Sequence, residues 1–123
     1  MSRVLIVDDV AAYRTMLASA LSEAGHVVRE ACDGDEALQT MEGFAPDLVI
    51  TDLIMPDKEG LETIIELKRL YPQVRIIAMT GSCHGREAIY LELARKFGAE
   101  CVLIKPFGLQ LLIDALGAGA TAA

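Results

Sequence analysis

The clearest structural signal in the sequence is Pro46-Asp47-Leu48-Val49-Ile50-Thr51-Asp52-Leu53-Ile54-Met55-Pro56, a run of aliphatic and β-branched residues around a carboxylate. A short apolar run of this kind is typical of a strand that is buried on both faces of a parallel sheet. Pro56 ends the segment, because proline has no N–H to donate and disfavours helical backbone in the residue before it. Asp52 therefore lies where a buried strand passes into a loop. In open α/β sheets ligands bind at that edge, and we expect Asp52 to be the chemical centre.

Similar strand-length runs recur along the chain, separated by segments in which apolar residues have helical spacing. We expect strands at Val4–Val7, Val27–Ala31, Leu48–Thr51, Val74–Met79 and Cys101–Ile104. We expect helices around Tyr13–Ala24, Ala37–Met41, Leu61–Lys68, Arg86–Phe97 and Leu109–Leu116. Five strands alternating with five helices predict an α/β fold, in which right-handed crossovers place helices on both faces of a parallel sheet.

Length and composition are those of one globular domain. The chain has 123 residues, of which 53% are hydrophobic and 24% are charged. This is enough to bury one core without disulfides or a structural metal. We expect the domain to span residues 1–117 and a flexible Gly/Ala tail to follow over residues 118–123.

Charge and cysteine content narrow the classes of function. The net charge of −7, with no basic cluster to offset it, argues against direct binding to nucleic acid. No apolar stretch has the length of a membrane span, and the N-terminus lacks a signal-peptide pattern. Cys32, Cys83 and Cys101 form no Cys-x-x-Cys pair, which fits a reducing compartment. We expect a cytoplasmic protein with no membrane partner.

Polar residues follow the predicted strands at the positions where each strand ends. They are Asp8 and Asp9 after the first strand, Asp52 at the third, Thr80 after the fourth and Lys105 after the fifth. Because the strands are parallel, these ends meet at one edge of the sheet. Three carboxylates so close together repel one another unless a cation joins them, and Mg²⁺, or Mn²⁺, is the natural partner for oxygen ligands. With an ammonium and a hydroxyl added, the set describes a site for a phosphoryl group in which one aspartate is the nucleophile.

These motifs resemble the receiver domain of two-component response regulators, as in the single-domain chemotaxis regulators. The resemblance covers Val4 to Leu116. It is carried by Asp8-Asp9, Asp52-Leu53-Ile54-Met55-Pro56 with Gly60, Thr80-Gly81 and Lys105-Pro106-Phe107. It implies a flavodoxin-like, doubly wound fold with a five-stranded parallel sheet in the strand order 2-1-3-4-5.

The resemblance also implies the chemistry of the acidic residues. Asp52 would be the phosphoacceptor, taking a phosphoryl group from a histidine kinase, from a histidine phosphotransfer protein or from a small donor such as acetyl phosphate. Asp9 and Asp52 would bind Mg²⁺ directly and Asp8 through water, and the backbone carbonyl of Ile54 would complete the protein ligands. The receiver would catalyse its own phosphorylation and dephosphorylation without being a turnover enzyme.

Other positions would bind the phosphoryl group and carry the signal. Lys105 would pair with phosphoryl oxygens, and the Lys105–Pro106 bond is expected to be cis. Thr80 would be the switch residue. The backbone N–H groups of Leu53 and Gly81 would donate hydrogen bonds to the phosphoryl group.

Three features depart from the family pattern. Val102 stands where many receivers have an aromatic partner of the switch residue, and Gly81–Gly85 has the composition of an extended loop. Ile54 is apolar where a polar side chain would position an attacking water, so we expect slow loss of the phosphoryl group.

The last predicted helix has a surplus of apolar residues, which suggests either a homodimer surface or burial at the chain end.

With no output domain in the sequence, the output would be contact with another protein. The alternatives are a pseudo-receiver that binds partners without phosphorylation and a receiver fragment of a larger regulator. A flavodoxin would need a Ser/Thr/Gly-rich phosphate loop after the first strand. A haloacid-type phosphatase would need two aspartates flanking one residue, which Asp52-Leu53-Ile54 does not supply.

Overall fold

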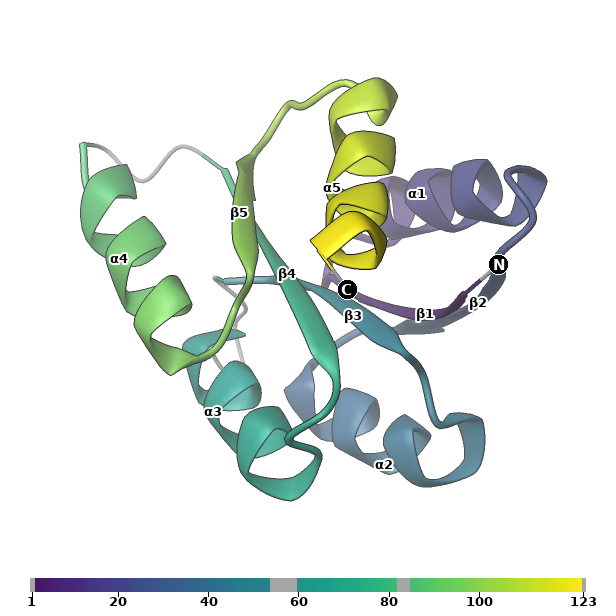
Figure 1. The fold of residues 1–123 in the computed structure, drawn as a ribbon, viewed down its shortest axis with the longest axis horizontal. Coiled ribbons are helices and arrows are strands. Elements are labelled where there is room, and N and C mark those ends of the chain that lie inside the picture. The colour runs from purple at the N-terminus through teal and green to yellow at the C-terminus, as the bar shows by residue number, and fades with distance from the viewer. Residues whose placement is uncertain (1, 54–59, 82–84, 123) are drawn as a thin grey trace.

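The computed structural model describes residues 2–53, 60–81 and 85–122. The strands are β1 (Arg3–Val7), β2 (Val27–Ala31), β3 (Leu48–Asp52), β4 (Arg75–Thr80) and β5 (Cys101–Ile104). The helices are α1 (Ala11–Glu23), α2 (Gly34–Phe44), α3 (Gly60–Leu70), α4 (Glu87–Phe97) and α5 (Leu109–Ala122). All strand pairs are parallel and the order is β2-β1-β3-β4-β5, which confirms the expected topology (Figure 1).

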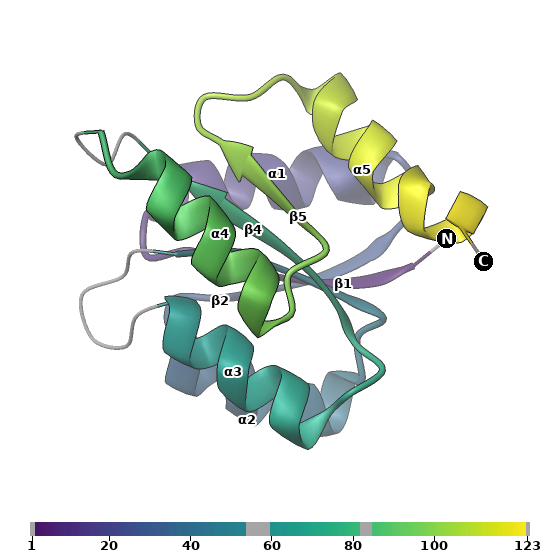
Figure 2. The ribbon, with the colours of Figure 1, turned by 60° about the vertical axis from the view of Figure 1, so that its left-hand side comes forward.

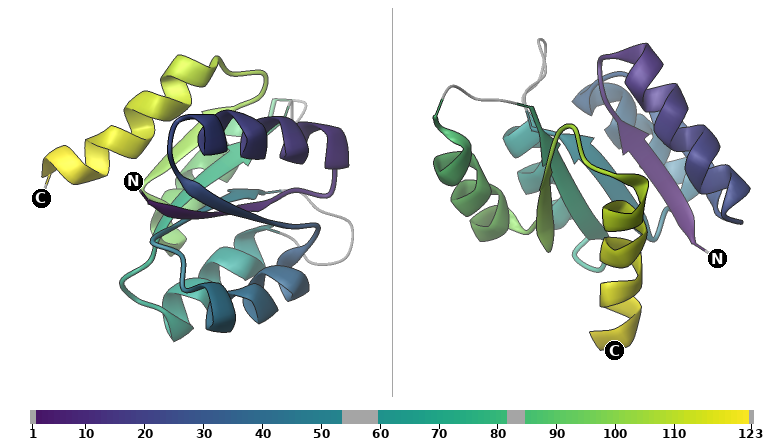
Figure 3. Two further views of the ribbon diagram at one scale, coloured as in Figure 1. Left: turned by 90° about the vertical axis from the view of Figure 1, so that its right-hand side faces the viewer. Right: turned by 90° about the horizontal axis from the view of Figure 1, so that it is seen from above.

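Helices cover both faces of the sheet. Helices α1 and α5 lie on one face, and α2, α3 and α4 lie on the other (Figures 2 and 3). Because successive residues of a strand point to opposite faces, Val4 and Ile6 pack with Leu17 of α1 and Leu112 of α5. Leu5 and Val7 face the other helices. The two cores explain why the strands have apolar runs rather than alternating patterns.

Strand β3 is the centre of the sheet, since β1 and β4 flank it. All of its residues from Leu48 to Asp52 are buried. Its carboxyl end therefore presents Asp52 from a rigid, fully paired element, which is the kind of support that a chemical site requires.

Most boundaries differ from the predicted ones by a residue or two, but the predicted last helix is too short. α5 continues to Ala122 instead of ending at Leu116. Gly117 suggests a stop, yet alanine is the strongest helix former, and the alanines beyond Gly117 favour continuation. The flexibility of residues 118–123 stays a prediction. No helix in the described part of the chain combines the length and apolar character that a bilayer crossing requires.

Candidate functional site

The ends of four strands bring the predicted polar residues to one edge of the sheet. The register pairs Val7 with Thr51 and Asp52 with Met79, and it pairs Thr80 with Ile104. Asp8 and Asp52 are therefore level along the strand direction, Thr80 lies one position further and Lys105 two positions further.

Three carboxylates form an acidic cluster at this edge. One oxygen each from Asp8, Asp9 and Asp52 lies within 4.8 Å of the others. Asp8 is fully buried and Asp52 is 6% exposed, whereas Asp9 is exposed. The Asp8 carboxylate is oriented by the backbone N–H of Val10, which donates to Oδ1 at 2.9 Å. Arg14 donates to the Asp8 carbonyl at 2.7 Å and braces the same turn. Hard oxygen ligands in this arrangement suit a divalent cation.

Lys105 places a positive charge between two of these carboxylates. Its Nζ donates to Asp8 Oδ2 at 2.7 Å and to Asp52 Oδ2 at 2.8 Å. Burial of Lys105 acts to lower the pKa of its ammonium, but the hydrogen bonds and negative charges of Asp52 and Asp8 outweigh that effect. The pKa of Lys105 therefore lies above its ordinary value, and the side chain stays charged at neutral pH. The Lys105–Pro106 bond is cis, as predicted.

Thr80 is fully buried at the end of β4. Its hydroxyl donates to the carbonyl of Gly81 at 3.2 Å, and its own carbonyl accepts the backbone N–H of Lys105 at 2.7 Å. The second bond ties the ends of β4 and β5 together.

One of the two predicted backbone donors, Leu53, is engaged within the sheet in this structure. The N–H of Leu53 donates to the Met79 carbonyl at 2.9 Å, so in this structure it extends the β3–β4 ladder and does not point freely into the site. The predicted ligand Ile54 and much of the Gly81–Gly85 loop lie outside the described residues.

Gly60 matters at this edge for a steric reason that the sequence alone did not show. Its N–H donates to the Leu53 carbonyl at 2.9 Å at the start of α3. A Cβ at this position would lie 2.0 Å from the Asp52 carbonyl oxygen and 2.5 Å from Leu53 Cα. Only glycine lets α3 begin so close to the end of β3.

Tyr13 is a neighbour of the site that sequence reasoning assigned only to the apolar face of the first helix. Its ring centroid lies 4.5 Å from Lys105 Nζ. The signal available in the sequence was its position in the first turn after Asp9, which places it near the acidic pair. Val102, which replaces the aromatic residue of many receivers, packs partly buried against the core beneath α2, α3 and α4.

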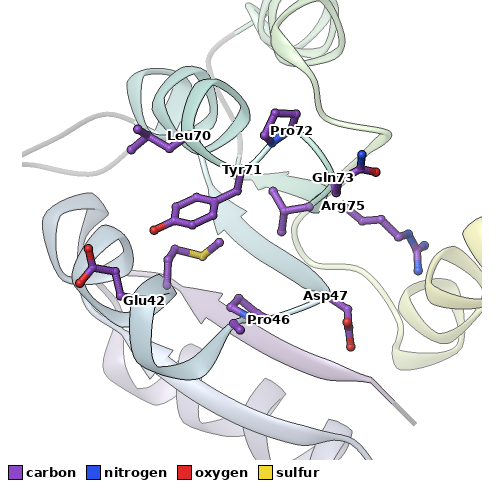
Figure 4. Close-up of a pocket in the computed structure, with 11 residues that line it drawn as sticks. Glu42, Pro46, Asp47, Leu70, Tyr71, Pro72, Gln73 and Arg75 are labelled. Atoms are coloured by element: carbon purple, nitrogen blue, oxygen red, sulfur yellow. The ribbon is translucent and has the colours of Figure 1, made fainter.

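A separate cavity of about 730 Å³ opens at the opposite edge of the sheet (Figure 4). The ends of α2 and α3, the segment before β3 and the start of β4 line it, with Met41, Pro46 and Tyr71 among its residues. None of the acidic-cluster residues lines it, so this cavity is separate from the acidic cluster.

Comparison with known proteins agrees with the geometry of the site. Residues 4–117 match the response regulator receiver domain family. The chain is 38% identical over 115 residues to the chemotaxis protein CheY of Thermotoga maritima, with 93% of each protein covered. It is 40% identical to the transcriptional regulatory protein PdtaR of Mycobacterium tuberculosis, but spans only 54% of that protein. The crystal structure of the receiver domain of NtrX from Brucella abortus superposes with a TM-score of 0.89 at 30% identity, covering 98% of this chain and 99% of that one. This chain therefore belongs to the family of response-regulator receiver domains.

Proposed function

We propose that Asp52 is the phosphoacceptor of this receiver. The observation that carries the proposal is the position of the buried Asp52 carboxylate. It belongs to the acidic cluster and shares the Lys105 ammonium with Asp8. An Asp52 oxygen would attack the phosphorus of a phosphohistidine or of acetyl phosphate. The bond between phosphorus and the donor's nitrogen or oxygen would break, and its electron pair would leave with the donor. The product is an acyl phosphate on Asp52.

The ion expected at this site is Mg²⁺, or Mn²⁺ in its place. Asp8, Asp9 and Asp52 would hold it together with the Ile54 carbonyl, and it would supply positive charge against the incoming phosphoryl oxygens. Lys105 already pairs with one oxygen each of Asp8 and Asp52. The exposed Asp9 leaves the cluster accessible from solvent.

Phosphorylation would then be converted into a change of shape. The Thr80 hydroxyl would exchange its bond to Gly81 for one to a phosphoryl oxygen, and Lys105 would pair with another oxygen. The backbone N–H of Gly81 would donate to the group as well, whereas Leu53 would first have to release the Met79 carbonyl. Since the Thr80 carbonyl holds the Lys105 N–H, movement at β4 would be passed to the loop after β5.

The partners follow from the same chemistry. The donor would be a histidine kinase or a histidine phosphotransfer protein in the cytoplasm, and the output would be contact with a protein target. Ile104, Leu109 and Leu111 are 44%, 45% and 52% exposed around β5 and α5, which supports a homodimer through the last helix. Sedimentation with and without a beryllofluoride mimic of the phosphoryl group tests this, and an unchanged monomer would count against it.

The phosphoryl group should be lost slowly, because Ile54 offers no polar side chain to orient a water. Decay of the phosphoryl adduct should be faster in Ile54→Asn than in the wild type. Equal lifetimes would show that this position does not control the lifetime.

The phosphoacceptor is tested by incubating the protein with acetyl phosphate and Mg²⁺ and measuring its intact mass. We expect one phosphoryl adduct, which should disappear in Asp52→Asn and when the divalent ion is chelated. Asp47→Asn is the matched control, because Asp47 lies exposed just before β3, at the opposite end of the strand. Absence of an adduct in the wild type, or its survival in Asp52→Asn, would overturn the proposal.

A further inference from the structure

Tyr13 reaches across from α1 to the segment that follows β5. Its ring lies 4.5 Å from Lys105 Nζ, within the range in which an aromatic face attracts a cation. The same ring meets Phe107 edge-on, with the centroids 6.1 Å apart and the planes at 89°. One side chain thus contacts both the ammonium of Lys105 and the residue two positions beyond it.

The Tyr13 hydroxyl does not explain this placement. Among the described residues, it is the buried side-chain nitrogen or oxygen for which no hydrogen-bond partner is found. Burying a hydroxyl without a partner is unfavourable, so the ring has to account for the position of the side chain.

The surroundings of the Lys105 ammonium show what the ring contributes. An ammonium carries three N–H donors. The Lys105 ammonium donates to a carboxylate oxygen of Asp8 at 2.7 Å and to one of Asp52 at 2.8 Å. The Tyr13 ring provides a further, electron-rich contact. To pair with a phosphoryl group on Asp52, the ammonium has to give up some of its contact with the carboxylates. The ring contact does not involve either carboxylate and can persist through that exchange.

We propose that Tyr13 is a positioning residue for phosphoryl transfer, whose ring holds the Lys105 ammonium against the site while the ammonium exchanges its contacts with the carboxylates of Asp8 and Asp52 for contacts with phosphoryl oxygens. The same ring also contacts Phe107 in the loop that carries Lys105. This inference rests on the proposed phosphorylation of Asp52.

The test compares phosphorylation rates of Tyr13 variants with acetyl phosphate and Mg²⁺. Tyr13→Leu removes the ring and should lower the rate at saturating donor by roughly 3- to 30-fold, with a smaller change in the donor concentration for half-saturation. Tyr13→Phe keeps the ring and should retain most of the rate. Tyr71→Leu is the matched control, because Tyr71 is a half-buried tyrosine at the opposite edge of the sheet.

A double-mutant cycle separates positioning from a general effect on folding. In a Lys105→Met background, Tyr13→Leu should cause no further loss of rate, because the ammonium on which the ring acts is absent. Urea unfolding confirms which variants are folded, and Tyr13→Met serves if Tyr13→Leu does not fold.

The outcomes are distinct. The inference is overturned if a folded ring-deleted variant keeps the wild-type rate, if Tyr13→Phe is as slow as Tyr13→Leu, or if the loss persists without Lys105. Failure of the wild type to accept a phosphoryl group on Asp52 would instead overturn the proposed function.

Discussion

Replacing Lys105 with methionine should show how strongly its ammonium holds the acidic edge together. The ion pairs are largely buried, with side-chain exposures of 17% for Lys105, 0% for Asp8 and 9% for Asp52. Removing one partner of a buried pair costs about 3–5 kcal/mol, because the remaining charge stays uncompensated. Discounted for the partial exposure of Lys105, the expected loss of unfolding free energy is about 2–4 kcal/mol. Methionine keeps much of the side-chain volume, so the loss reports mainly on charge.

The loss should depend on pH and on divalent ions in a defined way. The pKa of Lys105 is raised in the folded state, so its contribution is fully present below the pKa of an unfolded lysine and is lost only above it. The difference between wild type and variant should therefore be constant from neutral pH to about pH 9. Mg²⁺ should stabilise the variant more than the wild type, because the ion no longer competes with an ammonium.

Urea unfolding followed by circular dichroism measures the effect. With a slope of about 2 kcal/mol per molar urea, the midpoint should fall by about 1–2 M. Lys96→Met is the control, since Lys96 is exposed in the last turn of α4 and should cost less than about 1 kcal/mol. A Lys105→Met protein as stable as Lys96→Met without Mg²⁺ would refute the assignment of Lys105 as the internal counter-charge.

Two further measurements test the packing around the sheet. Gly60→Ala should lower the unfolding free energy by about 1–3 kcal/mol or more, because its Cβ would lie 2.0 Å from a backbone oxygen of β3. Gly43 lies in α2, and a Cβ there would meet nothing within 4 Å, so Gly43→Ala should instead raise the unfolding free energy by about 0.5–1 kcal/mol. Equal changes in the two variants would contradict the close approach of α3 to β3. Burial, followed by the charge of Glu100, raises the pKa of the Cys101 thiol. In a variant in which Cys32 and Cys83 are replaced by serine, Cys101 should therefore react with iodoacetamide at pH 8 more slowly than a free cysteine. Its rate should still climb above pH 9, and a rate at pH 8 equal to that of free cysteine would count against its burial.

The sequence predicts the sheet and most of the chemical edge because both depend on local patterns. Buried parallel strands are continuous apolar runs, and the residues that end such runs converge by topology alone. The strand pattern by itself is therefore enough to place Asp8, Asp52, Thr80 and Lys105 together. The predicted α5 is too short because Gly117 carries more weight in the pattern than the alanines that follow it.

The remaining differences depend on pairing between elements that are distant in the chain. The N–H of Leu53 is used by Met79 because of the β3–β4 register, which the residues of one strand do not specify. The contact of Tyr13 with Lys105 depends on how α1 is rotated against the end of β5. The requirement for Gly60 comes from the direction in which α3 approaches β3, for which the sequence supplies only the glycine itself.

Trapping the acyl phosphate by borohydride reduction tests the central claim most directly. Reduction of an aspartyl phosphate yields homoserine at the modified position, which peptide mass spectrometry can locate. After incubation with acetyl phosphate and Mg²⁺, we expect homoserine at residue 52 and at no other aspartate. Homoserine at Asp8 or Asp9, or at no position in a protein that carries a phosphoryl adduct, would contradict the account.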